Sequence, residues 1–202
     1  HKFELNAVPC GPEPTKTFRV PLGSSVTQTL RFKHYSKAAA DYTVTMGLGA
    51  DSPFEMETVP VKALAATDNQ GVLTITEIIF TPSKLGEVRD TLSLSSPLGG
   101  DYTVILAGTG MQPKPRGPLD VKNGGSIPIP VKNVFPDATT DFEFVVDQGG
   151  ASFSLKENKK TLAAKKDDVL TVNYKKDGEI TSGRVLVSAR GVTWVIYLRG
   201  TD

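Results

Sequence analysis

Hydrophobic and polar residues alternate with a period of two along many short stretches of the chain. Between residues 26 and 32, for example, the even positions are mostly apolar and the odd positions are polar. Because successive side chains of a β-strand point to opposite faces, this pattern predicts strands with one buried face. Roughly seven such strands in each half favour an all-β fold of two tandem immunoglobulin-like β-sandwiches.

The second half of the chain repeats the first. The shift that superposes the two halves falls from 101 residues near the start to 92 at the end, where Gly108 lies on Gly200. Because loops tolerate deletion better than strands do, shorter turns between matching strands would produce this drift. The sequence therefore predicts two homologous domains, 1–112 and 113–202.

A match at a shift between these two values predicts which residues of the two domains share a strand face. A shift of 97 residues superposes 72–75 on 169–172 and matches apolar with apolar residues. We therefore expect Ile75 and Val172 to occupy equivalent positions in the two domains.

Glycine and proline residues mark expected strand ends and edges. Gly108 and Gly200 follow the last apolar residue of a final strand, where they are expected to end the hydrogen-bonded ladder or to bulge it. Pro128 and Pro130 lie within a strand pattern, and proline cannot donate a ladder hydrogen bond. We therefore expect that strand to be an edge strand or to be bulged.

The ends of the sequence resemble linkers. Residues 3–14 are similar to the end of one repeat and the linker after it, and 113–118 is the matching Pro-rich linker between the two domains. The chain ends at 202 where a further linker would begin. We expect two units of a longer tandem array.

Composition and charge limit the classes of function. The chain has 202 residues, 39% of them hydrophobic, and a formal net charge of +1, without the basic excess expected of a nucleic-acid-binding protein. No apolar run approaches the length of a transmembrane helix, so direct membrane insertion is not expected. A single cysteine excludes an intramolecular disulfide and a thiolate zinc site.

Catalytic motifs are missing from the sequence. There is no phosphate-binding loop, no dinucleotide-binding fingerprint and no nucleophile elbow. His34 stands at the end of a strand pattern and is expected to be exposed, and Cys10 lies in a Pro-rich stretch with no partner for nucleophilic chemistry. We therefore expect no enzyme, no catalytic residue, no metal site and no cofactor.

Lysines cluster in the second half and are the candidate protein-binding residues. They are Lys159, Lys160, Lys165, Lys166, Lys175 and Lys176. One interpretation is a solvated face that protects sheet edges, and the other is a patch for an acidic partner.

Several apolar and glycine motifs together resemble a known family. They include Ile78-x-Phe80-Thr81-Pro82, the stretch from Tyr102 to Gly108, and the Pro-rich linker. These resemble the ASH domain, an immunoglobulin-like module related to the major sperm protein fold, and the tandem arrangement is most similar to hydin-like proteins of the ciliary axoneme. The second domain departs from the motif, because Tyr174-Lys175-Lys176 stands at the position of Phe80-Thr81-Pro82.

The resemblance implies a non-enzymatic scaffold or interaction module, in the axoneme of a cilium or flagellum, where it would belong to the central apparatus, or at the centrosome. Its partners would be other proteins of a cytoskeletal or ciliary assembly and neighbouring immunoglobulin-like domains of the same chain, with no nucleic acid. The location implied is the cytoplasm and its cytoskeleton. An alternative is an adaptor similar to major sperm protein that binds acidic motif peptides at membrane contact sites. A periplasmic chaperone or adhesin sandwich is a third possibility.

Overall fold

The computed structural model describes residues 15–136 and 138–202. The linker-like stretch predicted at 3–14, with Cys10, lies outside the described residues. Contacts divide the chain into two compact units, the first centred on 26–80 and 87–109 and the second on 110–202. The boundary expected between residues 112 and 113 stays a prediction.

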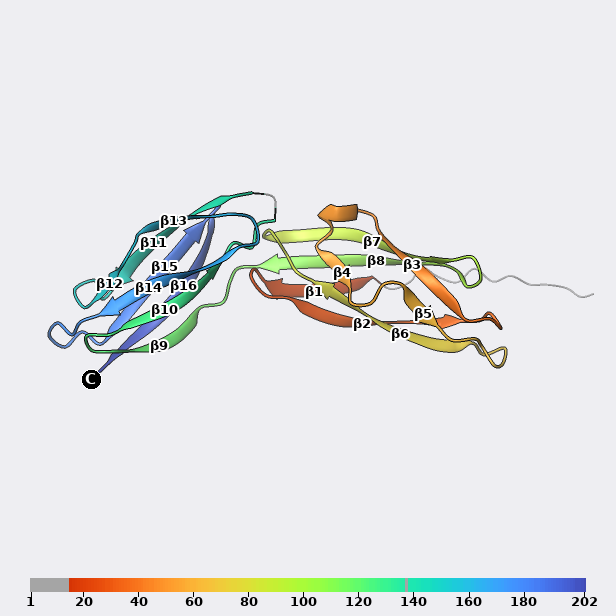
Figure 1. The fold of residues 1–202 in the computed structure, drawn as a ribbon, viewed down its shortest axis with the longest axis horizontal. Coiled ribbons are helices and arrows are strands. Elements are labelled where there is room, and N and C mark those ends of the chain that lie inside the picture. Colours follow the sequence, from red (N-terminus) through yellow and green to blue (C-terminus); the bar gives the residue numbers. More distant parts are fainter. Residues whose placement is uncertain (1–14, 137) are drawn as a thin grey trace, which may run out of the picture. The chain divides into compact units, whose positions relative to one another are not determined.

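The first unit is a sandwich of two sheets, drawn in red to green in Figure 1. One sheet has the strand order β1-β8-β7-β3-β5, and the other has the order β2-β6-β4. The strands are β1 (Lys16–Pro21), β2 (Val26–His34), β3 (Ala40–Met46), β4 (Phe54–Met56), β5 (Val61–Ala63), β6 (Val72–Phe80), β7 (Gly86–Ser96) and β8 (Gly100–Met111). A short 3₁₀ helix, η1 (Gly49–Asp51), stands between β3 and β4.

The second unit is built in the same way and is drawn in green to blue in Figure 1. Its sheets have the orders β13-β11-β15-β16-β9 and β10-β14-β12. The strands are β9 (Arg116–Lys122), β10 (Ser126–Lys132), β11 (Thr140–Gln148), β12 (Phe153–Leu155), β13 (Lys159–Leu162), β14 (Asp167–Tyr174), β15 (Ser182–Ala189) and β16 (Val192–Thr201). The expected all-β fold of two immunoglobulin-like sandwiches is confirmed.

Aromatic side chains fill the core of the first unit. Phe18, Phe54 and Phe80 are fully buried, and the centroids of the Phe54 and Phe80 rings lie 4.8 Å apart. Phe54 and Phe80 are also direct cross-strand partners between β4 and β6. Burying one such side chain stabilises a fold by about 1.5–3 kcal/mol, so this cluster holds the two sheets together.

The second unit repeats this arrangement with one substitution. Phe153 and Tyr174 are cross-strand partners between β12 and β14, and their ring centroids lie 4.7 Å apart. Tyr174 therefore takes the place of Phe80, as the motif match indicated. Its hydroxyl donates to the carbonyl oxygen of Ile180 at 3.3 Å, which satisfies the polar end of the ring.

Strand pairing corrects the predicted match of 72–75 with 169–172. Met56 of β4 pairs with Ile78, and the equivalent residue of β12, Leu155, pairs with Val172. Val172 is therefore equivalent to Ile78, three residues beyond Ile75. Side chains three residues apart in a strand point to opposite faces. The sequence match therefore placed Ile75 on the wrong face of β6.

Pro128 and Pro130 lie where their chemistry predicts. They belong to β10, which pairs only with β14 at the edge of its three-stranded sheet. Their rings are exposed, while Ile129 and Val131 between and beside them are buried. The prediction of an edge strand is confirmed, and the prolines leave that edge short of hydrogen-bond donors.

The expectation is wrong for Gly108, which lies inside β8. For Gly200 it holds on one side of the strand, because the ladder between β15 and β16 ends at Arg199, whereas the pairing with β9 continues to Thr201. The N–H of Gly200 still donates to the carbonyl oxygen of Thr181 at 2.7 Å. Both residues are buried. They are needed because each lies against an aromatic ring of the facing sheet, where a Cβ atom would overlap that ring.

Candidate interaction surfaces

The structure separates the six candidate lysines into three pairs. Lys159 and Lys160 lie on β13, an edge strand of the five-stranded sheet. Lys165 and Lys166 lie in the turn between β13 and β14, and Lys175 and Lys176 follow β14. Since β14 has eight residues, the last two pairs lie about 25 Å apart along the strand.

Neighbouring carboxylates already hold three of these lysines. Lys160 Nζ lies 3.1 Å from Glu157 and 2.8 Å from Asp168, so it links β13 to β14 across the two sheets. Lys159 pairs with Asp141 at 3.2 Å, and Lys176 pairs with Asp202 at 2.7 Å. All of these pairs are solvent-exposed to some degree, so each contributes little to stability.

The ion pairs shift the pKa values of the groups involved. The hydrogen bond to Asp168 raises the pKa of the Lys160 ammonium, and the same bond lowers the pKa of Asp168. The hydrogen bond to Asp202 likewise raises the pKa of Lys176. Within the described ranges no ion pair involves Lys165, Lys166 or Lys175. Of the six lysines, these three are therefore the ones whose charge is not already paired with a carboxylate. The binding role of the six lysines stays a prediction.

The sequence suggested that His34 is an exposed strand-end residue. In the structure it is completely buried. Its Nε2 donates to the carbonyl oxygen of Ala38 at 2.8 Å, and its Nδ1 lies 2.8 Å from the Tyr42 hydroxyl. The Tyr42 hydroxyl in turn donates to the carbonyl oxygen of Gly99 at 3.1 Å. His34 therefore ties the end of β2 to β3 and to the β7–β8 turn.

The alternation of the sequence contained the signal for this burial. His34 continues the even, inward-facing series of β2, in which Leu30 and Phe32 are buried. Burial, with the neighbouring Tyr102 as a smaller cause, raises the pKa of Tyr42 to about 12. His34 and Tyr42 are therefore part of the core and not an exposed catalytic pair.

Asn133 plays the corresponding part in the second unit. It is fully buried, and its Nδ2 lies 3.0–3.1 Å from the carbonyl oxygens of Ala138, Leu162 and Ala163. Its Oδ1 accepts from the N–H of Phe135 at 3.0 Å. One amide thereby joins the β10–β11 connection to the end of β13 and to the β13–β14 connection.

Several sheet edges are short or are covered by side chains of their own unit. β4, β5 and β12 have three residues each, and β13 has four. Along the long strand β2, Lys16 Nζ donates to Thr29 O at 3.3 Å, and the Tyr102 hydroxyl donates to Lys33 O. These features limit the addition of a partner strand at these edges.

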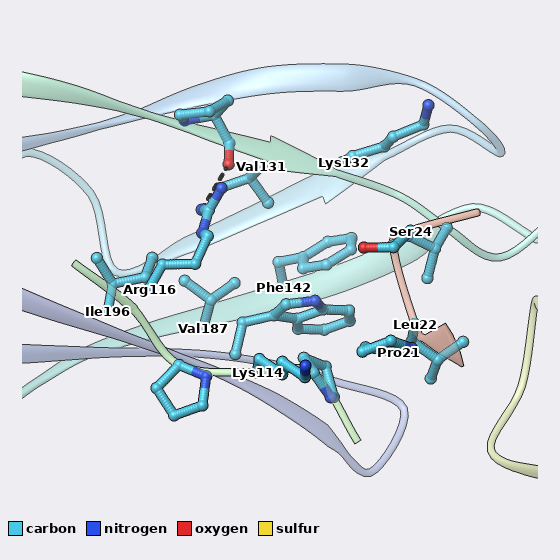
Figure 2. Close-up of a pocket in the computed structure, with 16 residues that line it drawn as sticks. Pro21, Leu22, Ser24, Lys114, Arg116, Val131, Lys132, Phe142, Val187 and Ile196 are labelled. Carbon is cyan, nitrogen blue, oxygen red and sulfur yellow. Dashed lines mark hydrogen bonds between the residues drawn. The ribbon is translucent and has the colours of Figure 1, made fainter. Parts of the chain in front are cut away.

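A pocket in the second unit is lined by Phe142, Val187 and Ile196 and by the partly buried Trp194 (Figure 2). Arg116 at its rim donates to the carbonyl oxygen of Pro130 at 3.3 Å, shown by the dashed line in Figure 2. Its lining residues include no carboxylate, imidazole or thiol.

The described part of the chain also contains no group of three or more His, Cys, Asp or Glu side chains that could hold a metal ion. No helix of the described residues is long and apolar enough to span a membrane.

Comparison with known proteins identifies relatives along the whole chain. The chain is 34% identical to the hydrocephalus-inducing protein of Mus musculus over 212 aligned residues, which cover 99% of the chain. It is 31% identical to the hydrocephalus-inducing protein homolog of Homo sapiens, again over 99% of its length. The chain spans about 4% of the length of each of these proteins. No protein-family profile matches the chain.

Among solved structures, the ASH/PapD-like domain 7 of human CEP192 aligns with a TM-score of 0.37 and 10% identity, over 56% of this chain and 99% of that domain. The Pseudomonas aeruginosa CupB2 chaperone aligns with a TM-score of 0.37 and 14% identity, over 94% of this chain and 98% of the chaperone. The resemblance to hydin-like proteins that the sequence motifs indicated is confirmed by the two sequence relatives.

Proposed function

We propose that this chain, a homologue of a segment of hydin, is a non-enzymatic structural module that presents protein-binding surfaces in the axoneme of a cilium or flagellum. The observation that carries the proposal is the sequence similarity to hydrocephalus-inducing protein over 99% of the chain. The axonemal setting comes from the resemblance to the hydin-like family. Two well-packed sandwiches, several of whose edges are short or covered, support a role as a rigid module and not as a catalyst.

Binding of the purified chain to isolated axonemes tests the proposal. We expect saturable co-sedimentation with salt-washed axonemes and no saturable binding to microtubules assembled from purified tubulin. A Gly200→Val variant, which disrupts the second core, is the control for dependence on the folded state. Equal binding to both polymers, or no saturable binding to axonemes, would contradict the axonemal role.

The adaptor that binds acidic motif peptides is the second candidate. The exposed Lys165 and Lys166, which have no ion pair within the described ranges, support it. Reversal of both charges in Lys165→Glu/Lys166→Glu is expected to abolish salt-sensitive binding of an acidic peptide. Unchanged binding in this double variant would remove the lysines from the candidate site.

A further inference from the structure

Strand β6 has its hydrophobic pattern inverted along its first half. Leu73 and Ile75 are 53% and 57% exposed, whereas Thr74 and Thr76 between and beside them are buried. The Thr76 hydroxyl is buried without a hydrogen-bond partner among the described residues. Both features destabilise the fold, because apolar surface is left in water and a polar group is removed from it.

Such departures from the usual pattern are found at functional sites, where binding offsets the cost in stability. The sequence could have placed the apolar residues inward and the threonines outward at little cost in strand propensity, because leucine, isoleucine and threonine are all compatible with a strand. The inversion therefore indicates that the outer face of β6 serves a purpose other than packing the first unit.

Strand β2 supplies cations beside these apolar side chains. In the antiparallel pair, Arg31 is the direct partner of Ile75, and Lys33 is the direct partner of Leu73. Direct partners on one face have their Cβ atoms about 5 Å apart. Tyr35 extends the row, since it is 56% exposed and its ring lies over Gly71. We call these five residues, Arg31, Lys33, Tyr35, Leu73 and Ile75, the β6 patch.

Neither cation of the β6 patch is held in an ion pair within the described ranges. The Lys33 ammonium donates to the carbonyl oxygen of Gln70 at 3.1 Å. On the other side of β6, β4 pairs only with 78–80, so that 72–76 has a strand neighbour on one side alone. The patch is thus an open, apolar and cationic surface.

These charges determine which occupant fits. A two-fold contact centred on the five patch residues would bring the cations of the two copies together, which disfavours self-association through the patch. Glu55 and Glu77 lie farther along the same face, opposite Ile79 and Thr29, and would be repelled by an anionic membrane surface. A protein segment with carboxylates flanking apolar side chains meets both the cations and the apolar row.

The second unit lacks this surface. With Val172 equivalent to Ile78, the positions of Ile75 and Leu73 are taken by Val169 and Asp167. Asp167 pairs across the strands with Lys132, so one of the two apolar positions carries an acid. The patch is a property of the first unit and not of the repeated fold.

We propose that the β6 patch binds a protein segment in which acidic residues flank apolar ones. The inference rests on the proposed function and deepens it, because it assigns one binding surface and the chemistry of its partner.

Selection from a random dodecapeptide phage library on the immobilised 202-residue chain tests the proposal. We expect enrichment of peptides that combine Asp or Glu with Leu, Ile or Phe and that contain few Lys or Arg residues. A synthetic copy of one enriched peptide is then titrated against variants. Leu73→Thr/Ile75→Thr and Arg31→Glu are each expected to weaken binding about tenfold or more, because each removes a central contact.

Val145→Thr in β11 is the matched control, since Val145 is 54% exposed on a strand of the second unit and its loss should leave the affinity unchanged. Threonine keeps the strand propensity at all three positions, and unchanged denaturation midpoints show that the variants fold. Enrichment of basic or neutral peptides, no enrichment, or loss of binding only in Lys165→Glu/Lys166→Glu would overturn the proposal.

Two further outcomes overturn it in favour of another occupant. One is a dimer in sedimentation equilibrium that Ile75→Thr abolishes, and the other is patch-dependent binding to phosphatidylserine–phosphatidylcholine vesicles. Axoneme binding that persists in Leu73→Thr/Ile75→Thr would leave the proposed function standing and refute the patch. If the wild-type chain does not bind axonemes but the selected peptides still bind the patch, the proposed function is refuted and the patch is not.

Discussion

Gly200 lies directly against the ring of Tyr174, and a Cβ atom at that position would overlap the ring. Gly108 has the same relationship to Phe80 in the first unit. In both units the last strand thus leaves room for an aromatic side chain of the facing sheet. The combination of a glycine and an aromatic ring is found in both units because protein interiors are close-packed. The ring fills the space that a side chain at the glycine position would otherwise take.

Gly108→Ala and Gly200→Ala are expected to destabilise the first and the second unit by about 1–3 kcal/mol each, the usual cost of overpacking a core. Chemical denaturation of each variant measures the free energy of unfolding. Trp194, the single tryptophan, is partly buried against the second core and reports on that unit by fluorescence. Gly150→Ala is the control, because no atom lies within 4 Å of a Cβ there. Equal stability of all three variants would show that the rings move aside.

Tyr42→Phe is expected to destabilise the first unit by about 1–3 kcal/mol, because it leaves His34 Nδ1 and the carbonyl oxygen of Gly99 without their partner. Tyr35→Phe is the control, since that residue is exposed. Hydrogen exchange of the amides of β2 and β3 measures the effect in the first unit separately. Equal protection in the two variants would contradict a role of the hydroxyl in the fold.

The raised pKa of Tyr42 predicts that the first unit loses stability in alkali. Its pKa is about 12 in the folded chain and 10.0 for an ordinary tyrosine, so the folded state holds this proton more tightly. The resulting stability is fully present below pH 10 and is lost as the pH rises towards 12. Denaturation at several pH values in this window, compared with Tyr42→Phe, measures the contribution. The same pH dependence in both proteins would refute the assignment to Tyr42.

Asn133→Asp is expected to destabilise the second unit by about 3–5 kcal/mol, as is usual for an uncompensated buried charge. The substitution keeps the shape of the side chain but replaces a donor by an oxygen that faces three carbonyl oxygens. Trp194 fluorescence during denaturation measures the loss. The control is Asn173→Asp, at an exposed position of β14. If both variants unfold at the same denaturant concentration, the three contacts of Asn133 do not stabilise the fold.

The local pattern of the sequence was sufficient to predict those features that depend only on residues close together in the chain. The alternation of 26–32 placed Leu30 and Phe32 inside, and the two prolines of β10 identified an edge strand. The repeat and its motifs indicated two sandwiches and the hydin-like resemblance. Each of these follows from a property of the chain itself, namely the two-residue period of a strand or the missing donor of proline.

Residues 72–80 show where this reasoning stops. Apolar side chains occupy both faces of β6, so its pattern gave no inward face, and the match of 72–75 with 169–172 assigned the wrong one. Only the pairing of Met56 with Ile78 decided that Leu73 and Ile75 are exposed.

The candidate lysines and the core glycines depended on distances that the sequence does not contain. Lys165 and Lys175 are ten residues apart in the chain, and β14 holds them at opposite ends of a strand. Gly108 and Phe80 belong to different sheets and meet only when these pack together. The sequence by itself therefore determined the fold class and the repeat, because both follow from local periodicity. The tertiary structure decided which faces and charges are exposed together, because strand register and sheet packing are set by contacts between distant residues.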